Sequence, residues 1–172
     1  MTWIECGPQH LEAIRAIFNE AIENSTALYV YEPRSVEFME EWWAAKQKAA
    51  CPVLGALNDD GVLAGFASYG PFRAHAAYQY TVEHSIYVDA RFRGQGLGRQ
   101  FLERIIAAAG AQGYHSLIGV IDAGNAVSIA LHERQGFTRA GSLREVGFKF
   151  GRWLDIVFYQ RLLSPPERVV EA

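Results

Sequence analysis

The sequence predicts a single α+β domain, residues 1–172, around one mixed β-sheet. Segments with helical spacing of apolar residues alternate with short β-rich segments, and no repeat, linker or low-complexity tract divides them. A chain of 172 residues can bury roughly two-thirds of its unfolded surface in one core. Apolar residues make up 50% of the chain and charged residues 20%, which is ordinary for a globular protein.

The first part of the chain predicts a strand, a helix, a loop and a second helix. Residues 3–6 form a short strand that a Gly-Pro pair ends. Apolar residues at three- and four-residue spacing predict an amphipathic helix over residues 11–24. An aromatic-rich loop follows over residues 25–33, and Ser35 is the expected N-cap of the second helix.

The middle of the chain predicts a hairpin, a central strand, a helix and a buried strand. Residues 52–57 and 62–69 flank an Asn-Asp-Asp-Gly turn, which favours a β-hairpin. A strand is predicted over residues 78–88, and a glycine loop follows it with a helix that ends near Gly113. Residues 115–121 are apolar enough for a fully buried strand.

The last part of the chain predicts one more helix and two strands. The helix spans residues 125–135, with Gly136 as the residue that ends it. Two strands follow, broken at residues 150–152, and the second of them spans residues 153–163. The tail, residues 164–172, begins Ser-Pro-Pro and is expected to fray.

Charge and cysteine content exclude several classes of function. A net charge of −3 and a pI of about 5.9 argue against nucleic-acid binding and favour small-molecule chemistry. Cys6 and Cys51 are too few for a disulfide framework and lack the spacing of a metal site, so two buried thiols and no metal are expected. Neither a signal peptide nor an apolar run of ~18 residues is present, so we expect a cytoplasmic protein that does not bind membranes.

Three glycines at alternate positions mark a candidate anion site. Gly94, Gly96 and Gly98 follow the predicted central strand and lead directly into a helical pattern. Without Cβ atoms, successive N–H groups can point into one concavity, and the helix dipole adds to the same field. The Lys-Ser/Thr pair of nucleotide-triphosphate loops is missing after Gly98, and the spacing differs from the dinucleotide fingerprint.

This run, Arg93-Gly-Gln-Gly-Leu-Gly, instead resembles the pyrophosphate-binding signature of the GCN5-related N-acetyltransferases, the GNAT superfamily. The resemblance implies the GNAT acyl-CoA N-acyltransferase fold, a mostly antiparallel sheet flanked by four helices. It also implies that acetyl-CoA is the co-substrate. The implied contacts to acetyl-CoA come from two backbone stretches and two downstream side chains: Ile86, Tyr87, Val88, Arg93, Gly94, Gln95, Gly96, Leu97, Gly98, Arg99, Asn125 and Arg134. An N–H near Val88 would polarise the thioester carbonyl.

A polar stripe on the predicted helix 125–135 carries a candidate acid. Asn125, Ser128 and His132 share one face, opposite the apolar residues. The resemblance places His132 where the family usually has a tyrosine that protonates the departing thiolate. A histidine with a pKa of about 6.5 can do the same near neutral pH. A solvated or capping histidine is the alternative.

Glu83 is the candidate base. A carboxylate within a β-rich strand is costly to bury without compensation. Amines with pKa values of ~8–10 are mostly protonated near neutral pH, so a carboxylate that removes a proton speeds acetyl transfer. An exposed strand face paired with a cation is the alternative. His84 should point to the opposite face of a regular strand, whereas a bulge would change this.

Five further stretches resemble the phosphinothricin and methionine sulfoximine acetyltransferase branch in the same order: residues 24–27, 70–74, 78–83, 131–133 and 141–155. The resemblance makes Glu83 the general base and His132 its assistant, with Tyr29 packed on the substrate. It also implies that the loop Arg73-Ala74-His75 grips the acidic groups of a small amino acid. His75 stands where some phosphinothricin enzymes have an arginine, which weakens the phosphinate assignment.

Physical chemistry agrees with a small anionic amino acid as substrate. The guanidinium of Arg73 can hold a carboxylate or phosphinate bidentately, and Tyr29 or Tyr31 can close an aromatic lid. We therefore expect direct acetylation of an amino acid by a homodimeric enzyme. A protein or polyamine acetyltransferase and a non-catalytic CoA-binding sensor are the alternatives, and the presence of both Glu83 and His132 argues against the sensor.

Overall fold

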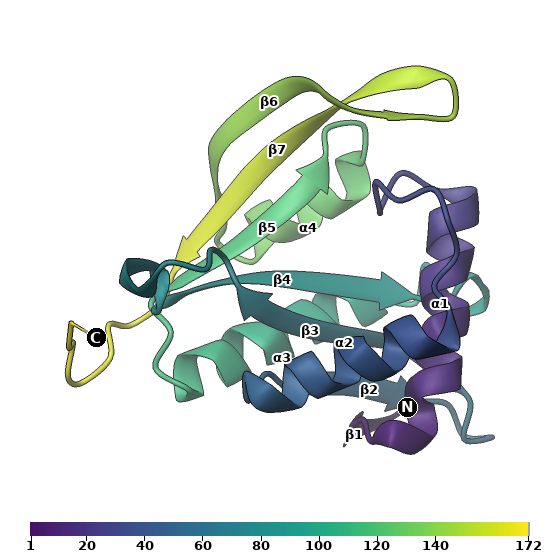
Figure 1. The fold of residues 1–172 in the computed structure, drawn as a ribbon, viewed down its shortest axis with the longest axis horizontal. Helices are drawn as coiled ribbons and strands as arrows, with labels where there is room; N and C mark the ends of the chain where they lie inside the picture. The colour runs from purple at the N-terminus through teal and green to yellow at the C-terminus, as the bar shows by residue number, and fades with distance from the viewer. Residues whose placement is uncertain (172) are drawn as a thin grey trace. The chain divides into compact units, whose positions relative to one another are not determined.

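The computed structural model of the protein describes residues 1–171 (Figure 1). Its chain divides into two compact units. Unit 1 comprises residues 1–68 and 86–101, and unit 2 comprises residues 69–85 and the chain from Leu102 onward. The described residues form a seven-stranded sheet in the order β1-β2-β3-β4-β5-β7-β6. The pairs β1–β2, β2–β3, β5–β7 and β7–β6 are antiparallel, whereas β4–β5 is parallel. These features and four helices confirm the predicted α+β fold.

Unit 1 begins as the sequence predicts, with a strand and two helices, and a β-hairpin follows them. Its elements are β1 (Thr2–Glu5), α1 (Leu11–Asn24), α2 (Val36–Lys48), β2 (Val53–Leu57) and most of β3 (Leu63–Pro71). Ser35 caps α2 as predicted, because its hydroxyl accepts the Phe38 N–H at 3.1 Å. Phe18 of α1 packs edge-on against Phe66 of β3, with ring centroids 4.9 Å apart, inside an apolar core. Cys6 and Cys51 are buried free thiols, as expected.

Unit 2 holds most of the second half of the chain. Its complete elements are β5 (Ser116–Asp122), α4 (Ala126–Arg134), β6 (Thr138–Lys149) and β7 (Arg152–Leu162). β6 and β7 meet at Phe150 and Gly151, whose φ angles of 51° and 72° fit the tight turn of a β-hairpin. Asn125 caps α4 by accepting the Ser128 N–H at 3.0 Å.

Three elements contribute residues to both units: β3, β4 (Thr81–Val88) and α3 (Leu97–Ala111). The predicted start of β4 at residue 78 is wrong. Tyr78 ends a 3₁₀ turn, Ala76–Tyr78, in which its N–H donates to the His75 carbonyl at 3.0 Å. Local hydrogen bonding therefore competes successfully with strand pairing in a segment whose tyrosines favour strands.

Within residues 1–171, no helix combines the length and the apolar character needed to cross a membrane. The tail from Ser164 to Glu171 contains no helix or strand. Its Val170 N–H donates to the Tyr80 hydroxyl at 3.0 Å, and its carbonyl accepts from the Gln79 amide at 3.0 Å. Fraying of this tail stays a prediction.

Candidate active site

The glycine loop of unit 1 has the backbone geometry that an anion cradle requires. Gly94 and Gly96 have φ angles of 78° and 76°, a left-handed region that favours glycine. A Cβ atom built on either residue would have no other atom within 4 Å, so the loop faces open space. Helix α3 starts at Leu97, immediately after these glycines. The loop can therefore present N–H groups and the positive end of a helix dipole to a phosphate.

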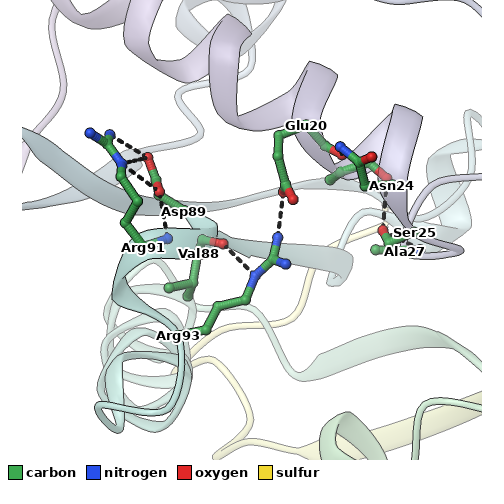
Figure 2. Close-up of polar contacts among 9 residues, drawn as sticks. Glu20, Asn24, Ser25, Ala27, Val88, Asp89, Arg91 and Arg93 are labelled. Carbon is green, nitrogen blue, oxygen red and sulfur yellow. Dashed lines mark hydrogen bonds and ion pairs between the residues drawn. The ribbon is translucent and has the colours of Figure 1, made fainter.

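Charged side chains next to the loop form hydrogen bonds and ion pairs with other residues of unit 1 (Figure 2). Asp89 accepts hydrogen bonds from the Arg91 backbone at 2.9 Å and from its guanidinium at 2.6 Å, which lowers the pKa of that carboxyl. Arg93 donates to the Val88 carbonyl at 3.1 Å and forms an ion pair with Glu20 of α1. The predicted cofactor contact of the Arg93 side chain stays a prediction, because in this structure the side chain ties the loop to α1.

The other predicted cofactor residues of unit 1 differ in what they can offer. Leu97 is only 3% exposed and packs in the core, which leaves its backbone as the part available to a ligand. Gln95 and Arg99 are exposed. Tyr87 packs against Phe18, with ring centroids 5.0 Å apart, so the side chains at this end of β4 serve packing.

The loop after α1 carries the predicted substrate contact Tyr29. The Ser25 hydroxyl donates to the Ala21 carbonyl at 2.7 Å and accepts the Ala27 N–H at 3.1 Å, which ends the helix and starts the loop (Figure 2). Tyr29 and Tyr31 beyond it are 36% and 69% exposed. Both aromatic rings are thus accessible, as a lid would require.

Glu83 lies in unit 2, half-buried on β4. Burial raises the pKa of its carboxyl, and the positive charge of Arg73 partly opposes this. Among residues 1–171, no hydrogen bond or ion pair engages this carboxylate. A base with a raised pKa and no competing donor is suited to accept a proton near neutral pH.

Arg73, Ala74 and His75 form an exposed loop, as predicted. The Arg73 guanidinium lies 4.1 Å from the centroid of the Phe72 ring and donates from Nη1 to the Phe72 carbonyl at 2.8 Å. Stacking and one hydrogen bond fix the guanidinium while leaving further N–H groups for an anion. The structure therefore brings Arg73 within electrostatic range of Glu83.

His132 of α4 is buried, with 5% of its surface exposed. Its Nδ1 lies 2.7 Å from the Ser128 carbonyl oxygen, and its Nε2 lies 2.9 Å from the Nε2 of His84. The register between β4 and β5 is regular from Thr81 to His84, so Glu83 and His84 point to opposite faces of β4, as predicted. In the described chain, His132 is hydrogen-bonded to His84, and no hydrogen bond connects it to Glu83.

Sequence reasoning did not find the contact of His84 with His132. His84 pairs with Gly119 across the parallel β4–β5 ladder, and a Cβ on Gly119 would lie 3.0 Å from both imidazole rings. A glycine inside a buried strand marks a close approach of other atoms, and Gly119 was the available signal. The predicted contacts of Asn125 and Arg134 are both at exposed positions, but the Asn125 amide already caps α4.

Within the described residues, no group of three or more His, Cys, Asp or Glu side chains is arranged to hold a metal ion. Unit 2 thus offers acid–base groups, Glu83 and separately the two imidazoles, and unit 1 offers a loop that can bind phosphate. Both parts match a group-transfer enzyme whose donor carries phosphate.

Residues 11–137 match the acetyltransferase (GNAT) family, and the chain belongs to this family of N-acetyltransferases. Over 161 residues it is 42% identical to an L-methionine sulfoximine/L-methionine sulfone acetyltransferase of Pseudomonas paraeruginosa, covering 94% of each chain. Over 164 residues it is 37% identical to a phosphinothricin N-acetyltransferase of Streptomyces viridochromogenes, covering 92% of this chain and 87% of the relative.

Solved structures agree with this assignment. A protein from Acinetobacter baylyi has a TM-score of 0.98 and 46% identity, with coverage of 99% of this chain and 97% of that one. A Salmonella typhimurium protein solved with its cofactor acetyl-CoA has a TM-score of 0.95 and 36% identity, with coverage of 100% and 99%. The predicted family and fold are confirmed.

Proposed function

We propose that the protein transfers the acetyl group of acetyl-CoA to the α-amine of a small L-amino acid or analogue such as methionine sulfoximine or phosphinothricin. The observation that carries the proposal is the half-buried carboxylate of Glu83, whose raised pKa the positive charge of Arg73 in the same unit partly opposes. A carboxylate with a raised pKa can take a proton from an α-amine, and a guanidinium can bind an α-carboxylate. The relatives are named for amino-acid analogues as their substrates, which supports the same class.

Acetyl-CoA is the co-substrate in this proposal. The backbone N–H groups of residues 94–99 hold the pyrophosphate, and the backbone of residues 86–88 positions the pantetheine and the thioester. The positive φ angles of the glycine loop support this role, as does the relative that was solved with acetyl-CoA. Asn125 and Arg134 are the proposed further contacts.

The proposed chemistry is a direct attack without an acyl-enzyme. Glu83 removes a proton from the amine, and the amine nitrogen forms a bond to the carbonyl carbon of the thioester. The bond between that carbon and the sulfur then breaks, and the thiolate takes up a proton with help from His132. A backbone N–H near Val88 stabilises the negative charge on the carbonyl oxygen.

We propose methionine sulfoximine as a better substrate than phosphinothricin. Arg73 provides one firm anion contact for the carboxylate that both compounds carry. The charged phosphinate would need a second cation, and His75 supplies at best a pH-dependent one. The neutral sulfoximine has no such need.

A panel assay tests the substrate class. CoA release would be measured with free amino acids, methionine sulfoximine, phosphinothricin, a polyamine and a peptide with a free N-terminus. We expect the largest kcat/KM for methionine sulfoximine. A larger value for phosphinothricin would reverse the ranking, and turnover of the peptide or polyamine alone would replace the substrate class.

We also propose that the enzyme is a homodimer that covers the β6–β7 hairpin. β6 is the last strand in the sheet order, and an uncovered edge strand invites pairing with another chain. Its hairpin exposes several large apolar side chains: Leu143 (47%), Val146 (49%), Phe148 (45%), Phe150 (57%) and Trp153 (62%). Light scattering should give twice the monomer mass for the native chain and a lower mass for Trp153→Glu. A native monomer at micromolar concentration would refute the proposal.

A further inference from the structure

The hydrogen bonds of His132 determine where its proton lies. Its Nδ1 is 2.7 Å from the carbonyl oxygen of Ser128, and a carbonyl oxygen can only accept, so Nδ1 carries the hydrogen. A neutral His132 then has a lone pair on Nε2. That lone pair needs a donor.

The Nε2 of His84, at 2.9 Å, is the group that meets this lone pair. For a hydrogen bond between two imidazole nitrogens, one nitrogen must carry the hydrogen, and here that nitrogen is Nε2 of His84. The Nδ1 of neutral His84 is then a lone pair, and this buried atom has no hydrogen-bond partner in the described chain. The two neutral rings thus carry two N–H hydrogens, and three of their four nitrogens take part in hydrogen bonds.

The residues around this pair enclose both rings and leave room for them. His84 and His132 are 8% and 5% exposed, and their rings stack with centroids 5.1 Å apart. Phe137 closes one side, with its centroid 5.5 Å from His84 and 5.0 Å from His132. Gly119 leaves room on the strand side, since a Cβ there would lie 3.0 Å from the His132 Nε2. His84 lies opposite Gly119 at the end of the parallel β4–β5 ladder.

Charge on the pair is strongly disfavoured. Burial lowers the pKa of His84 to about 3, with the neighbouring imidazole as the second cause, and burial also lowers the pKa of His132. The backbone carbonyls of Ile118 and Ser128 act in the opposite direction and do not prevail. From β7, the Tyr159 ring lies 6.4 Å from His132, but its hydroxyl donates to Glu133 Oε1 at 2.8 Å. Within residues 1–171, no other charged or titratable side chain influences either imidazole.

We propose that His84 is a positioning residue for His132: it donates its Nε2–H to the Nε2 of His132, and the two imidazoles work as one acid–base unit. A proton added at the Nε2 of His132 makes that nitrogen a donor, so His84 must then accept at its Nε2 and carry its own hydrogen on Nδ1. The reverse change on His84 follows when His132 gives this proton up. The catalytic use of this unit rests on the proposed function, in which His132 assists the departing thiolate. The proton positions themselves do not depend on it.

Nitrogen-15 NMR of the imidazole side chains of the whole protein tests the proton positions without any substrate. In the native protein we expect His132 with its hydrogen on Nδ1 and a titration midpoint below the ordinary value of a histidine. His84→Leu removes the donor, so the His132 midpoint should rise by at least about one pH unit. His84→Gln keeps an N–H donor and should behave like the native protein. A native His132 that carries its hydrogen on Nε2, or that titrates near its ordinary value, would overturn the proposal.

His115→Gln is the matched control. His115 is another histidine of unit 2 with a buried Nδ1 that lacks a hydrogen-bond partner. In the described chain no hydrogen bond or ring contact connects it to the pair, so its replacement should leave the His132 spectrum unchanged. If His84→Leu fails to fold, the native spectrum and His84→Gln still decide the proton positions.

Kinetics then test the use of the pair. We expect His84→Leu to lower kcat by at least about tenfold with little change in the KM for acetyl-CoA, and His84→Gln to recover most of the loss. Equal kcat values for the two variants would overturn the positioning role. If the native protein acetylates no amino acid in the panel, the proposed function fails while the NMR result still stands.

Discussion

The glycine loop and the imidazole pair offer a ligand two different kinds of group. The loop presents backbone N–H groups around Gly94 and Gly96, and its neighbouring charged side chains pair with each other. The pair is made of two side chains, His84 and His132, which lie 48 residues apart in the chain and are both buried. One region depends on local conformation and the other on tertiary contact.

This difference predicts how each region responds to its surroundings. The Arg91 and Arg93 side chains are 67% and 49% exposed, so salt weakens their ion pairs and the loop keeps its shape mainly through backbone conformation. The imidazoles are shielded from solvent, so the hydrogen bond between them changes whenever either ring gains or loses a proton. Substitutions can test separately the backbone conformation of the loop and the proton positions of the imidazole pair.

The largest effect is expected for Glu83→Gln, which belongs to neither region. The variant keeps the shape of the side chain and removes its basicity, so kcat should fall on the order of 10²–10⁴-fold while acetyl-CoA still binds. Steady-state kinetics and calorimetry measure the two quantities. Near-normal turnover at every pH would remove Glu83 from the role of base.

Gly96→Val tests whether the backbone conformation of the glycine loop is needed to bind acetyl-CoA. A β-branched residue is strained at a φ of 76° and would also project into the open side of the cradle, so acetyl-CoA affinity should fall by at least about tenfold. Gly110→Ala in α3 is the control, because a Cβ there also meets nothing within 4 Å and the residue has no positive φ. Unchanged affinity by calorimetry in a folded Gly96→Val protein would contradict the pyrophosphate site.

Arg73→Gln tests the electrostatic link to Glu83. Loss of a charged contact should raise the KM for the amino acid by about tenfold. Arg73 holds the pKa of Glu83 down, so its removal should raise that pKa further. Since only the deprotonated carboxylate is a base, the acid limb of the kcat/KM profile should move to higher pH. Arg73→Lys keeps the charge, and a limb that moves equally in both variants would argue against this link.

Acid should weaken the folded protein through the imidazole pair. The pKa of His84 is about 3 in the folded state, below its ordinary value of 6.5, so the unfolded chain binds a proton that the folded chain does not. The free energy of unfolding should therefore decrease as the pH falls from about 6.5 toward about 3. Urea unfolding at several pH values measures it. His84→Gln should flatten this dependence, and an identical slope would point to other groups.

The smallest effect is expected for Glu20→Gln, which breaks the tie between α1 and Arg93. Glu20 and Arg93 are 31% and 49% exposed, and pairs of this kind contribute at most about 1 kcal/mol. The KM for acetyl-CoA should change by less than about threefold. Glu12→Gln removes another α1 ion pair, with Arg15 at 2.6 Å, and serves as control. A change above tenfold for Glu20→Gln alone would mean that α1 shapes the cradle.

Much of the fold was predictable because its signals are local. The helix Leu11–Asn24, the Ser35 cap and the turn at Phe150 and Gly151 follow from apolar periodicity, capping chemistry and turn residues that act within a few positions. Residues 78–80 were assigned to a strand because their composition favours one, whereas the backbone hydrogen bonds of Tyr78 to His75 and of Gln79 to Ala76 decide for a turn.

The sequence by itself determined the family, the glycine loop and the strand position of Glu83, since backbone conformation and side-chain alternation are written in consecutive residues. Only the tertiary structure decided the partners of Arg93 and His132. Glu20 and His84 lie 73 and 48 residues away from them, and no local pattern specifies such contacts. The proton arrangement of the imidazoles follows from the carbonyl of Ser128 and the space above Gly119, and these act only after the chain has folded.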